Sequence, residues 1–248
     1  MSQLVHTKDQ GLISYKTLRR AVGCIGISLP FVLAIVNMLL VSKLILQGSV
    51  SGYYYTGVRG VLVGSLCAIG VFLFSYSGYN DWDKWLTNAA GVFAIGVALF
   101  PTAPANPSAS AKAVGYVHLT CAALLFITLA VIALWLFRLT EPHRERTPEK
   151  RKRDRVYLIC GVVIALCVAL VPVESLVIGA PIAKYHPLFW LEAVAIVAFG
   201  VAWLVKGETL FKDAAAPDQA VSGQATPTQA VPEVSPTRGL ADSRPGPD

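Results

Sequence analysis

The sequence carries little charge for its length. Only 15% of its 248 residues are Asp, Glu, Lys or Arg, while 54% are hydrophobic. A soluble domain usually carries about 25% charged residues, so the composition excludes an ordinary soluble domain and is typical of an integral membrane protein. Few ionisable side chains fall deep inside the apolar segments, which argues against a proton or ion pump.

Several motifs of well-known enzyme classes are also missing. The chain contains neither the glycine-rich phosphate-binding loop that ends in Gly-Lys-Ser/Thr nor the Gly-x-Ser-x-Gly elbow of serine hydrolases. It has no Cys-x-x-Cys pair, and all five cysteines fall in apolar segments. We therefore expect the cysteines to be small packing residues rather than a disulfide framework.

Long apolar segments are what the chain does have. A membrane-spanning helix needs about 20 predominantly apolar residues, and over such lengths only a helix satisfies its own backbone hydrogen bonds in lipid. We therefore predict an all-α fold, a bundle of six transmembrane helices. The predicted spans are residues 21–47, 61–79, 85–103, 114–139, 155–179 and 187–207.

Basic residues are unevenly distributed between the predicted loops. One group precedes the first span and a larger group lies at 138–155, between the fourth and fifth spans. Basic residues of short loops stay in the cytoplasm, and six spans put both groups on one side. We therefore predict a multi-pass protein of the cell membrane with cytoplasmic N- and C-termini. Topology and anionic lipid headgroups explain the basic run, so membrane lipids, and no nucleic acid, are the expected partners.

This topology predicts that the chain is divided into three parts. Residues 1–20 form a cytoplasmic N-terminal segment, and residues 21–213 form the six-span membrane domain. Residues 214–248 are rich in Pro, Ala, Ser, Thr and Gln without any apolar period, which predicts a disordered cytoplasmic tail.

Residues 51–64 combine three consecutive tyrosines with an arginine at the mouth of the second span. Tyrosines at such a boundary are typical of an aromatic belt. The spacing of Gly60 and Gly64 predicts a close helix contact. Arg59, beside that contact, needs a carboxylate, carbonyl or phosphate partner.

The predicted topology also brings polar residues from separate segments to the outer side of the membrane. Glu192 lies inside the sixth span, and a carboxylate there must be paired or protonated, with Arg59 or His118 as the expected partner. These polar residues have three possible interpretations: a structural network, a ligand pocket, or a catalytic or metal site. The candidate ligand-binding residues are Ser51, Tyr55, Arg59, His118, Glu174 and Glu192.

A metal site has little support from spacing. A hydrolytic zinc ion takes three protein ligands and an open position, and the chain has four histidines in all. The only histidines predicted on the outer side are His118 and His186, so the conceivable ligand set is these two with Glu192. Since no His-Glu-x-x-His pattern occurs, we predict no cofactor, with zinc as the alternative.

Three stretches resemble a family of uncharacterised bacterial multi-pass integral membrane proteins, a domain of unknown function. They are Ser-Gly-Tyr-Tyr-Tyr-Thr-Gly-Val-Arg-Gly from residue 51, Ala-Leu-Phe-Pro-Thr from residue 98, and Phe-Trp-Leu-Glu from residue 189. The resemblance covers about residues 12–212 and implies a membrane protein without a specified activity. That family often has His-Thr-x-x-Arg-Asp where this chain has Tyr55 to Gly60, and the missing His and Asp argue against a metal or acid–base role.

A more distant likeness is to the superfamily of alkaline ceramidases and progestin/adiponectin receptors. The likeness would imply seven spans and a zinc ion held by three histidines, with a nearby Ser and Asp. This chain has six predicted spans and too few outer histidines, so the likeness is one of fold only.

The expected function is therefore the binding of a lipid headgroup or small ligand in an outward-facing polar pocket. The alternatives are a membrane-embedded metal-dependent hydrolase related to the ceramidases, active or degenerate, and a small-solute permease. The sequence shows no inverted repeat of the transporter kind, which argues against the permease. It predicts no specific catalytic residue.

Overall fold

The computed structural model describes residues 15–42, 45–76, 81–139, 147–174, 183–207 and Thr209. These residues form an all-α fold and belong to one compact unit of the chain, residues 1–213. Residues 1–14 and the tail from residue 214 lie outside the described part, so the predicted disorder of the tail stays a prediction.

The described residues form six α-helices and three short 3-10 helices. The α-helices are α1 (Tyr15–Val41), α2 (Arg59–Phe74), α3 (Asp81–Leu99), α4 (Ala109–Leu134), α5 (Pro148–Val173) and α7 (Pro187–Lys206). The 3-10 helices are η1 (Ser51–Tyr55), η2 (Leu136–Arg138) and η4 (Ala183–Tyr185). Each predicted span corresponds to one α-helix, but only α7 begins at the predicted residue.

The other helices begin earlier because their first turns are polar and still helical. The first turn of α5 shows why: the Thr147 side chain accepts the backbone N–H of Lys150 at 3.1 Å, and Pro148 occupies the first helical position. Both features stabilise a helix start. In the same way, the Ser108 side chain accepts the N–H of Ala111 at the start of α4. Hydropathy locates only the apolar part of each helix, so it places these starts too late.

Four of the described helical segments are long and apolar enough to cross a membrane, which indicates a multi-pass membrane protein. They are Lys16–Val41, Ala109–Arg138, Pro148–Val173 and Pro187–Lys206. The remaining two helices differ from these in length or charge. Helix α2 has 16 residues, about 24 Å at 1.5 Å per residue, and α3 carries Asp81 and Asp83 in its first turn.

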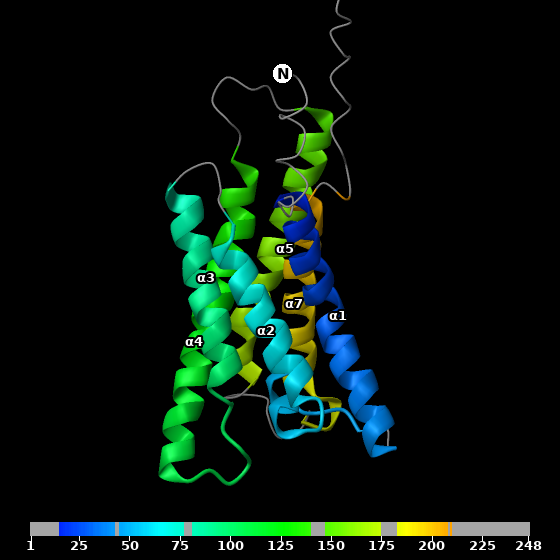
Figure 1. Cartoon of the computed structure of the whole chain (residues 1–248), viewed down its shortest axis with the longest axis vertical. Coiled ribbons are helices and arrows are strands. Elements are labelled where there is room, and N and C mark those ends of the chain that lie inside the picture. Colours follow the sequence, from blue (N-terminus) through cyan, green and yellow to red (C-terminus); the bar gives the residue numbers. More distant parts are fainter. Residues whose placement is uncertain are drawn as a thin grey trace, which may run out of the picture. The chain divides into compact units, whose positions relative to one another are not determined.

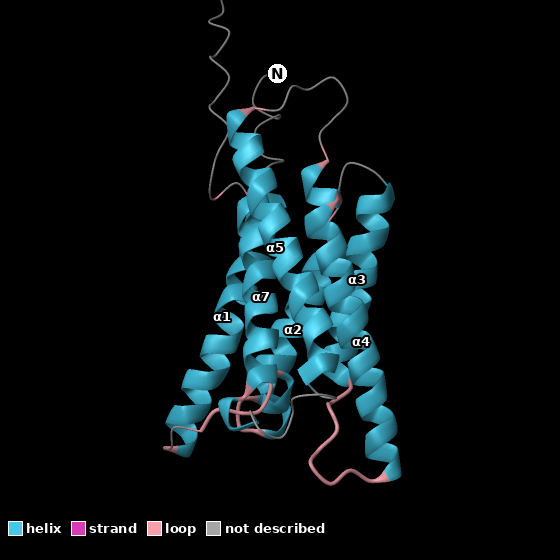
Figure 2. Ribbon diagram, turned by 180° about the vertical axis from the view of Figure 1, so that it is seen from behind, coloured by secondary structure: helices cyan, strands magenta, loops and turns pink. Residues whose placement is uncertain are grey.

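The helices pack as a closed ring. Each helix contacts the one before it and the one after it, and α1 also packs against α7. Figure 1 shows that consecutive helices run in opposite directions, and Figure 2 shows the same arrangement from behind. The start of α1 and the end of α7 therefore lie at the same end of the ring, which we call the basic end. Segment 45–58 and the loop between α3 and α4 lie at the opposite end.

Glycines allow the closest contacts between neighbouring helices. A Cβ added at Gly200 of α7 would lie 2.8 Å from the carbonyl oxygen of Gly23 of α1. A Cβ added at Gly91 of α3 would lie 2.9 Å from the carbonyl oxygen of Gly70 of α2. Small residues let two backbones approach in this way, so these pairs fix where α1 meets α7 and where α2 meets α3.

The close contact predicted at Gly60 and Gly64 is wrong for this bundle. A Cβ at either position would meet nothing within 4 Å, and both glycines are exposed. The reason is that both glycines lie on the exposed side of α2. The α2–α3 contact uses Gly70 instead.

Basic side chains satisfy helix carbonyls at the basic end. Arg20 Nε donates to the carbonyl of Gly207 at 3.1 Å, and Arg19 Nη1 donates to the carbonyl of Lys206 at 3.3 Å. Carbonyls at a helix C-terminus have no intrahelical partner and carry partial negative charge. These two arginines of α1 therefore cap α7 and help to close the ring.

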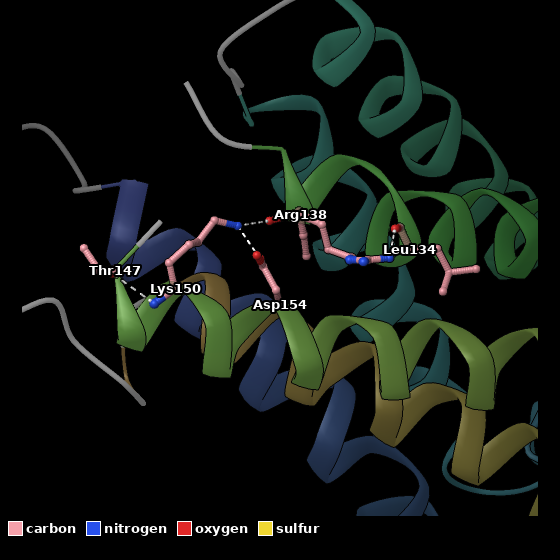
Figure 3. Close-up of polar contacts among 6 residues, drawn as sticks. Leu134, Arg138, Thr147, Lys150 and Asp154 are labelled. Carbon is pink, nitrogen blue, oxygen red and sulfur yellow. Dashed lines mark hydrogen bonds and ion pairs between the residues drawn. The ribbon is translucent and has the colours of Figure 1, made fainter. Parts of the chain in front are cut away.

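The end of α4 is capped in the same way (Figure 3). Lys150 Nζ donates to the carbonyl of Phe137 at 3.1 Å and forms an ion pair with Asp154, while Arg138 Nη1 donates to the carbonyl of Leu134 at 3.2 Å. The described basic residues from both predicted groups thus gather at one end of the ring. Which side of the membrane this end faces stays a prediction.

Candidate functional site

A cavity of about 70 Å³ lies inside the ring of helices. Helices α1, α2, α3, α4 and α7 line it, and segment 50–54 contributes to it at the end opposite the basic end. Most of the lining is apolar. Its walls include Leu62, Leu66 and Ile69 of α2 and Leu125, Phe126 and Leu129 of α4.

Glu192 of α7 is the acidic residue of this lining. Its Oε2 accepts the backbone N–H of Val50 at 2.5 Å and that of Ser51 at 3.1 Å, and its Oε1 accepts the Ser51 hydroxyl at 3.2 Å. The carboxylate therefore caps the start of η1, where backbone N–H groups have no other partner. The expected pairing with Arg59 or His118 does not occur among the described residues, because backbone amides and a hydroxyl take that place.

Small residues allow segment 47–52 to fold against α7. The Ser49 hydroxyl accepts the N–H of Gly52 at 2.9 Å, and the N–H of Phe189 donates to the carbonyl of Gly48 at 3.1 Å. The small side chains of Gly48, Ser49, Ser51 and Gly52 leave room for these backbone contacts. The segment is thereby held on the first turn of α7, next to Glu192.

Tyr53 anchors the same segment in an apolar cluster. Its side chain is fully buried, and its ring lies 6.3 Å from that of Phe189. Burial raises the pKa of the Tyr53 phenol, and the N–H of Gln47, which donates to its oxygen, offsets part of this rise. Tyr53 is therefore a neutral packing residue that holds η1 in place.

His118 brings a second polar side chain to the cavity. It is 7% exposed, and its Nδ1 lies 2.7 Å from the carbonyl oxygen of Phe100, just beyond the end of α3. The Nδ1–H donates to this carbonyl, because a carbonyl oxygen can only accept. His118 thus fixes the end of α3 against α4, and it is one of the residues that line the cavity.

Arg59 and Tyr55 are exposed residues near the cavity and do not belong to its lining. The Arg59 guanidinium carbon lies 4.0 Å from the centre of the Tyr54 ring, and its Nη2 donates to the Tyr54 hydroxyl. Tyr54 itself lines the cavity. Tyr55 is 53% exposed, and its hydroxyl donates to the carbonyl of Thr102 at 2.5 Å.

The structure therefore divides the six predicted ligand-binding residues into two groups. Ser51, His118 and Glu192 line one cavity, whereas Tyr55, Arg59 and Glu174 do not. Glu174 lies at the end of α5, a helix that contributes no residue to the lining.

The conceivable zinc ligands do not form a metal-binding group. In the described part of the chain, no three His, Cys, Asp or Glu residues are placed to hold a metal ion. His186 precedes α7 with a left-handed backbone (φ 52°) and is absent from the cavity lining, whereas His118 and Glu192 belong to it. The set of His118, His186 and Glu192 is therefore not brought together.

The sequence did not point to Tyr54 or to the apolar walls as parts of the site. Tyr54 looks like one of three equivalent belt residues, and only the turn of η1 distinguishes it from Tyr53 and Tyr55. Leu and Phe residues of α2 and α4 look like ordinary lipid-facing or packing residues. A cavity between them has no signature in the sequence.

Comparisons with models of protein families, with curated proteins and with solved structures found no match. The resemblance of residues 12–212 to a family of membrane proteins accordingly stays a prediction.

Proposed function

We propose that the protein is a six-span protein of the cell membrane, with both termini in the cytoplasm, that binds a small and largely apolar ligand inside its ring of helices. The observation that carries this proposal is the cavity, whose apolar walls meet polar groups of Ser51, His118 and Glu192. Ligand sites in proteins are typically concave and mostly apolar, with a few converging polar groups.

Six spans require that α2 and α3 also cross the bilayer. Both are members of the ring: α2 contacts α1 and α3, and α3 contacts α2 and α4. Segment 51–58 directly precedes α2 at the end opposite the basic end. This segment and the short α2 together can extend across the apolar layer of about 30 Å. The basic residues at the other end favour a cytoplasmic position for that end.

The cavity favours the hydrocarbon part of a ligand over a lipid headgroup. Its walls are apolar, and Arg59, the expected phosphate partner, lies outside it against Tyr54. No contact among the described residues specifically favours the hydrolase or the permease. Ligand binding is therefore our proposed function, ahead of the hydrolase and the permease.

Photolabelling tests this function. A short alkyl diazirine with a hydroxyl end is added to the protein in phosphatidylcholine nanodiscs, and the labelled residues are mapped by mass spectrometry. We expect labels on the cavity walls of α2 and α4. Ala122→Leu fills part of the cavity and should reduce this labelling several-fold.

Ala165→Leu provides the matched control, because Ala165 is exposed on α5, which contributes nothing to the lining. It should leave the labels on α2 and α4 unchanged. Labels confined to lipid-facing residues, with no difference between the two variants, would contradict the proposed function.

A further inference from the structure

The charges around the cavity are unbalanced. Glu192 is part of the lining, but the lining contains no lysine or arginine. Its hydrogen-bond partners are two backbone amides and the Ser51 hydroxyl, all of them neutral. A carboxylate that is removed from water is either protonated or balanced by a cation or a metal ion, because burying an unpaired charge is costly.

The described cations at this end of the ring are held elsewhere. Arg59 is exposed and engaged with the ring and hydroxyl of Tyr54. Lys184 is exposed and lies over the ring of Tyr185, with 4.9 Å between Nζ and the ring centre. Lys112 is exposed on α4. The remaining described cations of the helix ends belong to the basic end, across the length of the ring.

Other groups of the lining also suit a positive charge. Phe126 and Phe199 are aromatic residues of the lining. Aromatic faces attract ammonium groups, and binding sites for quaternary ammonium ligands are built from such rings.

We propose that the ligand of this cavity is a lipophilic monocation, an amine or quaternary ammonium group on an alkyl or aryl body. Its charge pairs with the Glu192 carboxylate, and its body lies against the apolar walls of α2 and α4. This assignment rests on the function proposed above. An anionic ligand would meet the carboxylate with like charge, and an uncharged ligand would leave it either protonated or without a counter-charge.

The test compares three photoreactive probes with the same short alkyl diazirine chain and different ends: trimethylammonium, hydroxyl and carboxylate. The protein is placed in nanodiscs of phosphatidylcholine, whose zero net charge avoids enriching one probe at the surface. For the unmodified protein we expect the ammonium probe to label the α2 and α4 walls at concentrations roughly tenfold below those of the hydroxyl probe. The carboxylate probe should label them least.

Glu192→Gln separates charge from shape. Glutamine has nearly the same size, and its carbonyl oxygen accepts the Val50 and Ser51 amides, but it carries no charge. We expect this variant to lose the preference for ammonium, so that the ammonium and hydroxyl probes label the walls at similar concentrations. Glu149→Gln is the matched control, since Glu149 lies in the first turn of α5 at the basic end, and it should keep the preference.

The outcomes distinguish this assignment from the proposed function. Equal labelling of the unmodified protein by ammonium and hydroxyl probes overturns the assignment but leaves the cavity as a binding site. A preference for ammonium that persists in Glu192→Gln also overturns it. If no probe labels the lining, both the assignment and the proposed function fail. The comparison of probes on the unmodified protein stands even if Glu192→Gln fails to fold.

Discussion

Glu192 also has a structural role, because it joins α7 to the segment between α1 and α2. Removing its carboxylate would leave the Val50 and Ser51 amides without their acceptor. A buried donor without a partner costs about 1–3 kcal/mol. The same residue thus holds η1 in place and supplies the negative charge of the cavity.

This role predicts a graded loss of stability. Glu192→Ala should lower the free energy of unfolding by about 2–4 kcal/mol, because two amides lose their acceptor, whereas Glu192→Gln should cost less than half of that. Thermal unfolding in a neutral detergent, followed by tryptophan fluorescence, measures the difference. Glu149→Ala is the control, and an equal shift for Glu149→Ala and Glu192→Ala would contradict the capping role.

Two substitutions of His118 test the hydrogen bond from Nδ1 to the Phe100 carbonyl. Asparagine places an amide donor close to the position of Nδ1, so His118→Asn should keep the bond to the Phe100 carbonyl and lose less than about 1 kcal/mol of stability. His118→Leu lacks the donor and should lose about 1–3 kcal/mol. Unfolding midpoints of the two variants, measured side by side, test this; a less stable Asn variant would argue against the bond.

The sequence predicted part of the cavity lining: three of the six candidate ligand-binding residues belong to it and three do not. Topology alone placed Ser51, His118 and Glu192 at one end of the spans, and the structure places all three in one cavity lining. The partner of Glu192 was not predictable, because backbone amides exist at every residue. Only the fold of the Gly48–Gly52 turn exposes two of them to the carboxylate.

At the scale of the helices, glycines have different roles depending on the direction that they face. Gly200 lies against the backbone of α1, with Gly23 O and Ile27 N each 2.8 Å from an added Cβ. Gly64 faces open space. A glycine is therefore required for the helix contact at position 200, whereas at position 64 it makes no helix contact.

This difference predicts opposite outcomes for one substitution. Gly200→Ala should destabilise the protein by about 1–3 kcal/mol, because the methyl group has no room against the α1 backbone. Gly64→Ala should be neutral or stabilise it by up to about 1 kcal/mol, because alanine favours helix over glycine. Unfolding midpoints of the two variants test this, and equal destabilisation by both would contradict the packing described.

The hydropathy of the chain predicted the six α-helices of the described residues, whereas other properties determine where these helices start and what they contact. Capping by Thr147 and Ser108 extends helices beyond their apolar parts. A Gly-x-x-x-Gly spacing, as at Gly60 and Gly64, indicates only that a close approach is sterically allowed. Which glycine meets a neighbour depends on how far each helix is rotated about its axis, and the sequence of one helix does not determine that.

At the scale of the whole ring, the predicted orientation can be tested directly. Single cysteines at Lys152 and Ala105, in a background in which the native cysteines are replaced, report the two ends of the bundle. If the basic end is cytoplasmic, a membrane-impermeant maleimide added to intact cells should label Ala105→Cys and not Lys152→Cys. Permeabilised cells, in which both should react, are the control, and the reverse pattern in intact cells would contradict the orientation.

The contact between α1 and α7 has a consequence for the order of the chain. Arg20 and Gly207 lie within a hydrogen bond of each other, so the first and last helices begin and end side by side. A short linker between them, with the chain opened between η2 and α5, would give the order α5, α7, α1, α2, α3, α4 with the same neighbours throughout. Circular permutation succeeds where ends are adjacent. A ring closed in this way has no structurally privileged first helix.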